Sequence, residues 1–296
     1  MIWFVTGSSR GLGREIVIAA LERGDRVAAT ARKPAQLDDL AQKYGDRLLA
    51  LPLDVTDKDA VDAAVATTVR TFGGLDVVVN NAGWADLSAF EDTSIDNFRA
   101  QVETNFFGVV NVNKAVVPIL RGQGRGSLIT VSSVGGRVGT PGLSAYQAAK
   151  WAVSGLGVVL AAELAPLGVK VTTVEPGGIA TDWAGSSMTV PPISEPYQAS
   201  VGVMAALHGG DAVALGDPAK VARAVTEVAD MERPPVRLLL GSDAFAVAGA
   251  AARATAEQDA ANEALSRSTD RDGATARQRD PLGQGFSTAA DGDAGE

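Results

Sequence analysis

Short apolar runs alternate with longer segments of helical periodicity along most of this 296-residue chain. The apolar runs, which we expect to be strands, are residues 2–6, 26–31, 48–53, 75–79, 128–131, 169–174 and 237–240. The segments with apolar residues at helical spacing are residues 14–23, 34–44, 56–72, 95–120, 144–167 and 218–231. Because the helices that connect parallel strands cover both faces of a sheet, this alternation predicts an α/β fold with a doubly wound, parallel, seven-stranded sheet.

Distinctive side chains and glycines follow the ends of these expected strands. Sheets of this kind bind ligands beyond the carboxyl ends of their strands. The residues that fall at those ends are Gly7, Arg32, Asp54, Asn80, Ser133 and Pro176. Their coincidence at one edge of the sheet predicts a single ligand site there.

A glycine-rich turn, Thr6-Gly7-Ser8-Ser9-Arg10-Gly11-Leu12-Gly13, joins the first expected strand to the first expected helix. Glycines let the backbone turn tightly and approach a pyrophosphate, which then lies at the helix N-terminus. A glycine cluster alone is weak evidence, but its place between a strand and a helix predicts a dinucleotide site.

Basic residues end the second expected strand, where an NAD site usually carries an acidic residue for the ribose hydroxyls. Arg32, helped by Arg10, could instead pair with a 2′-phosphate, so NADP(H) is favoured over NAD(H). The alternative is a solvated arginine after a strand. Asp54 could bond an adenine amino group or be a plain turn carboxylate, and Asn80-Asn81-Ala82-Gly83 could line a ligand or form an Asx turn.

A tyrosine and a lysine four residues apart, in Tyr146-Gln147-Ala148-Ala149-Lys150, lie on one face of an expected helix. A tyrosine hydroxyl has a free pKa of about 10, and a nearby cation lowers it. The hydroxyl can then donate a proton to a developing alkoxide, and Ser133 can add a hydrogen bond to the same oxygen. The trio suits carbonyl chemistry, although a tyrosine and a lysine at this spacing also occur by chance.

Composition excludes several other kinds of chemistry. The chain has no cysteine and one histidine, His208, so thiolate zinc sites and cysteine nucleophiles are excluded and a Ser-His-Asp triad is disfavoured. We expect no metal. The net charge of −9 argues against nucleic acid as a partner. The first residues do not resemble a signal peptide and no apolar run is expected to span a membrane, so we expect a cytoplasmic protein.

One domain is expected over residues 1–250. Residues 183–216 break the alternation and contain several prolines and glycines, which is typical of a lid or substrate loop. Residues 251–267 are alanine-rich and predict a helix, and the polar residues 268–296 predict a disordered tail.

Together these motifs resemble those of the short-chain dehydrogenase/reductase family. The residues that carry the resemblance are Thr6 to Gly13, Asn80-Asn81-Ala82-Gly83, Asn105, Ser133, Tyr146-Gln147-Ala148-Ala149-Lys150 and Pro176-Gly177. The resemblance extends over residues 2–241 and implies a single Rossmann domain.

The resemblance also implies roles for four residues. Tyr146 would be the general acid in reduction and the general base in oxidation. Lys150 would lower the pKa of Tyr146 and hold the nicotinamide ribose. Ser133, thirteen residues before the tyrosine, would orient the substrate carbonyl. Asn105 would hold a water that links Lys150 to solvent.

The implied cofactor site involves the glycine turn and the later strand ends. Thr181 would contact the nicotinamide carboxamide, and Asn81 would form part of the cofactor wall. The full set is Gly7, Ser9, Arg10, Gly11, Leu12, Gly13, Arg32, Asp54, Val55, Asn81, Ala82, Gly83, Tyr146, Lys150, Pro176, Gly177, Ile179 and Thr181. Arg10 and Arg32 resemble the NADP-preferring branch. The last motif is similar to that of bacterial oxidoreductases related to the 17β-hydroxysteroid dehydrogenases, and its residues are Glu175-Pro176-Gly177 and Thr181-Asp182. This similarity does not identify a substrate.

The family commonly pairs two of its helices with their copies in a second subunit. The corresponding segments carry apolar residues on more than one face: Val109, Val110, Val112, Val116, Trp151, Val158 and Val159. A helix that is apolar on two faces needs a second partner, so we expect a homodimer or homotetramer. The alternative is that both faces are buried inside one subunit.

These observations predict an NADP(H)-dependent oxidoreductase that interconverts a ketone or aldehyde and an alcohol. One alternative is a non-catalytic NADP-binding sensor or scaffold, although such proteins usually lose the tyrosine or the lysine. Another is an epimerase or dehydratase of the extended branch, which normally has tighter glycine spacing and a larger C-terminal domain.

Overall fold

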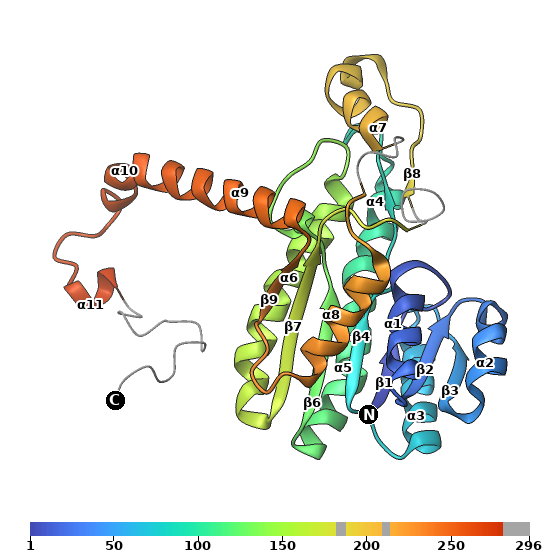
Figure 1. Cartoon of the computed structure of the whole chain (residues 1–296). Coiled ribbons are helices and arrows are strands. Elements are labelled where there is room, and N and C mark those ends of the chain that lie inside the picture. Colours follow the sequence, from blue (N-terminus) through green and yellow to red (C-terminus); the bar gives the residue numbers. More distant parts are fainter. Residues whose placement is uncertain (182–187, 209–213, 281–296) are drawn as a thin grey trace. The chain divides into compact units, whose positions relative to one another are not determined.

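The structure is a computed structural model, and it describes residues 1–181, 188–208 and 214–280. It divides into two compact units, Met1–Ala246 and Val247–Glu296. The first unit contains a parallel seven-stranded sheet with the order β3-β2-β1-β4-β6-β7-β9 (Figure 1). Its strands are β1 (Ile2–Val5), β2 (Arg26–Ala31), β3 (Leu48–Pro52), β4 (Val77–Asn80), β6 (Gly126–Val131), β7 (Val169–Pro176) and β9 (Arg237–Leu240). The predicted fold class is confirmed.

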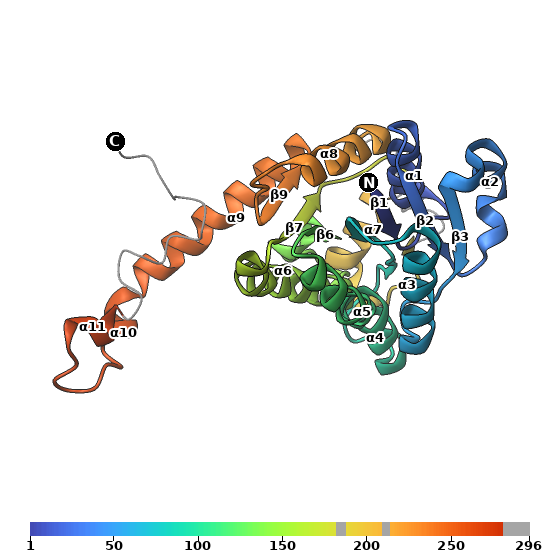
Figure 2. The ribbon, with the colours of Figure 1, turned by 90° about the horizontal axis from the view of Figure 1, so that it is seen from below.

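Helices cover both faces of this sheet, as Figure 2 shows. The helices on one face are α1 (Gly11–Glu22), α2 (Asp38–Tyr44) and α8 (Pro218–Asp230), and those on the other are α3 (Lys58–Phe72), α5 (Gly108–Gln123) and α6 (Ser144–Leu164). Each layer buries its own apolar cluster against the sheet, with Ile16, Leu37 and Val225 in one. Phe4, Val116 and Leu128 lie in the other.

The expected long helix over residues 95–120 is interrupted in the structure. Helix α4 (Ile95–Val102) is followed by a π-helical turn, Glu103–Phe107, and only then by α5. The turn contains Asn105, whose side-chain amide donates to the carbonyl oxygen of Gln101, 2.9 Å away, and to that of Trp84, 2.8 Å away. Apolar periodicity does not reveal such a turn, because one inserted residue shifts the helical face by less than half a turn.

The expected loop over residues 183–216 contains regular structure in its described part. The two-residue strand β8 (Met188–Thr189) pairs with β5 (Ala85–Asp86), which follows β4 along the chain. Helix α7 (Val203–His208) lies further along this segment. Residues 182–187 and 209–213, which include Trp183 and Asp182, lie outside the described residues.

The second unit begins within a helix. Helix α9 (Ser242–Ala261) starts earlier than the expected 251 and is followed by α10 (Glu263–Arg267). Within the segment expected to be disordered, Ala276–Arg279 forms the short helix α11, which begins with a capping box between Thr275 and Gln278. Residues 281–296 lie outside the described part.

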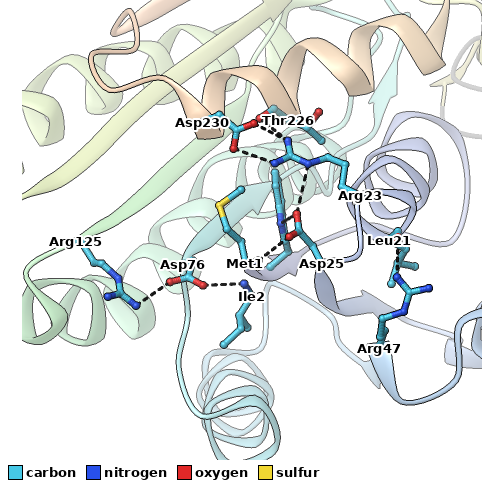
Figure 3. A network of polar contacts seen from close by, with 11 residues as sticks. Met1, Ile2, Leu21, Arg23, Asp25, Arg47, Asp76, Arg125, Thr226 and Asp230 are labelled. Atoms are coloured by element: carbon cyan, nitrogen blue, oxygen red, sulfur yellow. Dashed lines mark hydrogen bonds and ion pairs between the residues drawn. The ribbon is translucent and has the colours of Figure 1, made fainter.

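Polar contacts close the sheet at the amino ends of its strands (Figure 3). The buried Asp25 accepts hydrogen bonds from the Met1 amine at 2.6 Å and from the Trp3 indole at 2.9 Å. Arg23 ion-pairs with Asp230 at 2.8 Å, which joins the end of α1 to the end of α8. These charges lie at the edge of the sheet opposite to the strand ends that carry the predicted site.

One expectation about membranes is corrected. Within residues Ser144–Leu167, an 18-residue stretch has a mean hydropathy of 1.4, and the segment is long and apolar enough to cross a bilayer by length and composition alone. The same helix packs against β7 and carries the buried polar residues Gln147, Lys150 and Ser154 on its sheet-facing side.

Candidate active site

Ser133, Tyr146 and Lys150 meet at the carboxyl end of β6. Ser133 follows the strand and caps a short turn, Val134–Gly136, by accepting a hydrogen bond from the Gly135 amide at 3.0 Å. Its hydroxyl also hydrogen-bonds the Tyr146 phenol. The Lys150 ammonium donates to the Val131 carbonyl oxygen at 2.9 Å and lies 5.4 Å from the centre of the Tyr146 ring. The strand end and the first two turns of α6 therefore bring the three side chains together.

Burial controls the protonation of this group. It raises the pKa of the Tyr146 phenol to about 12, and the hydrogen bond from Ser133 opposes that rise. It lowers the pKa of the Lys150 ammonium to about 8. Desolvation of the phenolate is the larger effect on the pKa of Tyr146 in this structure, and the lowering of that pKa by Lys150 stays a prediction.

Asn105 lies directly beside the lysine. Its side chain is fully buried, and its carbonyl oxygen Oδ1 has no hydrogen-bond partner among the described residues. A Cβ atom added at Gly83 would lie 2.6 Å from this oxygen and 3.7 Å from the Lys150 Nζ. Gly83 thus keeps a space open between the two groups, and an unsatisfied buried carbonyl in such a space is a suitable acceptor for a water.

The residues that follow β4 hold the glycine turn in place through hydrogen bonds. The Asn81 amide donates to the carbonyl oxygens of Thr6 and Gly7 at 3.0 and 3.1 Å. The Thr6 hydroxyl accepts from the backbone amides of Asn81 and Ala82. Asn81 therefore braces the turn with its side chain. Sequence reasoning missed Thr6, whose role requires β1 and β4 to be neighbours.

Glycines are required at two points of this turn. Gly7 has φ +67°, and a Cβ there would lie 2.8 Å from the Ala82 Cα. A Cβ at Gly13 would collide with the Asn81 amide and the Gly7 carbonyl oxygen. The first amides of α1 consequently lie beside a backbone without side chains, which is the form of a pyrophosphate site.

The remaining predicted cofactor residues surround this turn. Arg10 and Arg32 are exposed, at the start of α1 and the end of β2, while Ser9 is half-buried and Leu12 lies in the core. Asp54 accepts from the Thr56 amide at 3.0 Å and the Thr56 hydroxyl at 2.8 Å, so it forms an Asx turn. The Val55 side chain is buried against Gly108.

The loop after β7 crosses toward the glycine turn. A Cβ at Gly11 would lie 3.6 Å from the Thr181 Cβ, so the two segments are in contact range. Pro176 ends β7, and Ile179 forms a bridge with Gly216. The Gly178 amide donates to the Asp243 carboxylate at 2.8 Å, and this carboxylate occupies the space that a side chain at Gly177 would need. Asp243 was not expected, because it follows in sequence only after β9.

An apolar cluster surrounds the tyrosine. Tyr146 packs with Leu87 and Leu143, with Met188 of β8, and with Val201 from the segment between β8 and α7. An adjoining groove of about 650 Å³ has mainly apolar walls, to which Phe90 and Trp151 contribute. The described part of residues 183–216 therefore lies next to the candidate catalytic group.

Comparison with known proteins agrees with this architecture. A sequence model of the family described as short chain dehydrogenase matches residues 1–189. The chain belongs to the short-chain dehydrogenase/reductase family and is an oxidoreductase. It is therefore an enzyme, which sets aside the non-catalytic sensor.

Individual relatives resemble nearly the whole chain. Oxidoreductase BOA17 of Botryotinia fuckeliana is 55% identical over 260 residues, which are 87% of this chain and 95% of that protein. A short-chain dehydrogenase from Streptomyces avermitilis is 39% identical, with a TM-score of 0.86, covering 91% of this chain and 98% of that one. The closed form of serine dehydrogenase complexed with NADP+ is 26% identical, with a TM-score of 0.71 and coverages of 81% and 94%.

Proposed function

We propose that this oxidoreductase interconverts a ketone or aldehyde and an alcohol, with NADP(H) as its cofactor. The observation that carries the proposal is the hydrogen bond between Ser133 and the buried Tyr146, with the Lys150 ammonium beside the ring. Two hydroxyls that converge at a strand end can bind one substrate oxygen together.

The side chains divide the reaction between them. With a pKa raised to about 12, Tyr146 carries its proton at neutral pH and can donate it to the oxygen of the carbonyl being reduced. Ser133 donates a hydrogen bond to the same oxygen. Lys150, with a pKa of about 8, is mostly charged at neutral pH and stabilises the phenolate that remains after the transfer. A bound nicotinamide cofactor supplies the hydride in reduction and accepts it in oxidation.

Asn105 supports proton return to this group. We infer that a water bound by its unpaired Oδ1 connects the Lys150 ammonium with solvent through the space beside Gly83. After Tyr146 gives up its proton, the lysine can return one of its own to the phenolate and then regain a proton from solvent through this water. In oxidation the same path runs in reverse and removes the proton that Tyr146 takes from the alcohol.

The cofactor site fits a dinucleotide. The glycine turn has no room for side chains at Gly7 and Gly13, and it opens directly onto the start of α1. The exposed Arg32 at the end of β2 supports a 2′-phosphate, hence NADP(H). The remaining cofactor contacts that we propose are those of Asp54, Val55, Ala82, Pro176, Gly177, Ile179 and Thr181.

The apolar cluster around Tyr146 supports an apolar carbonyl substrate. A relation to 17β-hydroxysteroid dehydrogenases fits this setting, as do a polyketide and an aromatic ketone. Residues 183–216 would act as the substrate loop.

The test is oxidation of NADPH with a panel of ketones and aldehydes, repeated with NADH and with the Tyr146→Phe variant. Removing the general acid should lower kcat by roughly 100-fold or more. Tyr44→Phe, which removes the same hydroxyl from a buried ring of α2, is the matched control. If Tyr146→Phe retains native kcat, Tyr146 is not the proton donor.

A further inference from the structure

The most deeply buried charge near the candidate site has no part in the reaction proposed above. Glu175 is the residue before Pro176 at the end of β7, and its side chain is 0% exposed. A buried carboxylate is unfavourable unless ion pairs and hydrogen bonds surround it. Its complete burial therefore calls for a physical reason.

Two arginines share this carboxylate. Arg137 contacts Oε2 through Nε at 2.6 Å and Nη2 at 2.5 Å. Arg237, from β9, contacts Oε1 through Nε at 2.7 Å and Nη2 at 2.5 Å. Each arginine side chain is about one-third exposed, at 28% and 31%, so the two ion pairs reach from the interior to the surface.

Arg137 connects the glutamate to the turn that Ser133 begins. The Arg137 amide donates to the Val134 carbonyl oxygen at 2.8 Å, and the Gly136 amide donates to the Ser133 carbonyl oxygen at 2.9 Å. The turn is thus closed at one end by Ser133 and at the other by Arg137. Glu175 fixes Arg137 to β7, and Arg237 also donates to the Gly136 carbonyl oxygen at 3.4 Å, so both arginines hold the turn and Arg137 is the one that belongs to it.

Two serine hydroxyls connect the Glu175 carboxylate with the backbone of Lys150. The Ser154 hydroxyl lies 3.2 Å from Glu175 Oε1 and 3.0 Å from the Ser132 hydroxyl, which lies 3.1 Å from the Lys150 carbonyl oxygen. Gly136 packs closely against this cluster: a Cβ atom added there would lie within 3.0 Å of the Ser154 hydroxyl, the Lys150 carbonyl oxygen and the Ser132 hydroxyl. The serine turn, β7 and the catalytic stretch of α6 are therefore packed around one polar cluster.

We propose that Arg137, held by Glu175, is a positioning residue for Ser133: the ion pair sets where the Ser133 hydroxyl lies relative to Tyr146. This inference rests on the proposed function, since it assigns a partner to the proposed Ser133. Neither residue touches the reacting atoms. A misplacement of about 1 Å at such a hydroxyl costs up to 100-fold in rate, so a loosened turn is measurable.

The test is Arg137→Met, which leaves Glu175 paired with Arg237 and so keeps the buried carboxylate neutralised. We expect kcat for NADPH-dependent reduction of phenanthrenequinone, used as a carbonyl probe, to fall roughly 10- to 100-fold. The Kd for NADPH should stay within about twofold, because the glycine turn lies on other strands. Arg137→Lys, which keeps the charge, should recover part of the loss.

Two comparisons separate positioning from general destabilisation. In a Ser133→Ala background, Arg137→Met should cause little further loss of kcat, because its effect acts through the serine. Asp25→Asn, which removes a buried carboxylate at the opposite edge of the sheet (Figure 3), should lower stability but leave kcat unchanged. Hydrogen exchange adds a readout that needs no nucleotide: the amides of Gly135, Gly136 and Arg137 should exchange faster in Arg137→Met and not in Asp25→Asn.

Each result has one meaning. If Arg137→Met keeps native kcat and native exchange, or lowers kcat equally with and without Ser133, the positioning role is overturned. If Ser133→Ala and Tyr146→Phe themselves keep native kcat, the proposed function fails instead. If the probe is not reduced at all, unchanged amide exchange in Arg137→Met still overturns the inference and faster exchange still supports it.

Discussion

Burial and charge oppose each other at Lys150. The side chain is 4% exposed, and burial lowers its pKa to about 8 from 10.5. Below pH 8 the folded protein keeps a buried charge that the unfolded chain carries in water, which costs about 3 kcal/mol. Above pH 8 the folded state has released a proton that the unfolded chain still binds. The free energy of unfolding should therefore rise between pH 8 and pH 10, and fall above that as the raised pKa of Tyr146 takes effect.

Lys150→Met removes this cost. We expect the nucleotide-free variant to be more stable than the native chain at neutral pH by roughly 2 kcal/mol, since the lost hydrogen bond to Val131 offsets part of the gain. The rise in stability above pH 8 should disappear. Urea unfolding at neutral and at alkaline pH measures both, with the exposed Lys220→Met as control. A variant that is less stable at neutral pH would show that the folded state does not disfavour the charge.

Arg32 decides the proposed choice of cofactor. Arg32→Asp should weaken NADPH binding by roughly 10- to 100-fold and NADH binding much less, because only NADPH carries the 2′-phosphate that pairs with the guanidinium. Nucleotide titrations measure the two Kd values, and Arg70→Asp, at an exposed arginine of α3, is the control. Equal losses for both nucleotides would contradict a 2′-phosphate contact.

At the scale of elements, the contact between α6 and β7 sets the height of Tyr146 and Lys150 above the sheet. Gly157 is the point of closest approach, because a Cβ there would collide with the Thr173 hydroxyl oxygen of β7. That oxygen is buried and has no hydrogen-bond partner among the described residues. The absence of one side chain thus lets a long helix lie flat on a strand.

Gly157→Ala should push α6 away from β7. We expect a loss of about 1–3 kcal/mol in the free energy of unfolding, because the packed interface does not accommodate a methyl group. The kcat should fall as well, since both catalytic side chains belong to this helix. Gly122→Ala, at a helical glycine of α5 with open space around it, should instead be neutral or stabilising. Equal effects on the two helices would exclude the steric explanation.

At the scale of the whole molecule, α6 has an apolar face that the described chain leaves uncovered. Trp151, Val158 and Val159 are 53%, 42% and 53% exposed, whereas Val109, Val112 and Val116 of α5 are buried. The alternative that both faces are buried within one subunit is therefore wrong for α6. We propose that a second copy of the chain covers this face, in a dimer or a tetramer.

Val159→Arg tests this proposal. The native chain should show a molar mass in solution that is a multiple of 30.3 kDa, and the variant should shift toward the monomer, because a buried unpaired arginine disfavours the interface. Light scattering after size-exclusion chromatography measures the mass. Ala66→Arg, on the exposed side of α3, is the control. A native monomer at micromolar concentration would contradict the proposal.

Local pattern was sufficient for the seven strands of the main sheet and their order along the chain, but not for the π-helical turn or for β5, β8 and α7. Each strand is a short apolar run, and the glycines at positions 7, 11 and 13 mark the first turn because their backbone conformation and close packing exclude side chains. The strand ends converge because parallel strands share one carboxyl edge. Ser133, Tyr146 and Lys150 could be selected together because the serine ends a strand, the tyrosine and the lysine share one helix face, and their spacing resembles that of a known family.

Tertiary structure alone decided the contacts between segments far apart in the chain. Thr6 meets Asn81 only because β1 and β4 are neighbours, and Asp243 reaches Gly178 only after β9 has joined the sheet. In the sequence, Glu175 is only the residue that follows the sixth expected strand, but two distant arginines make it the centre of a buried cluster. The tertiary structure also determines the direction of the pKa shift at Tyr146. This direction depends on how much water the fold removes from the phenol, and spacing along one helix carries no information about that.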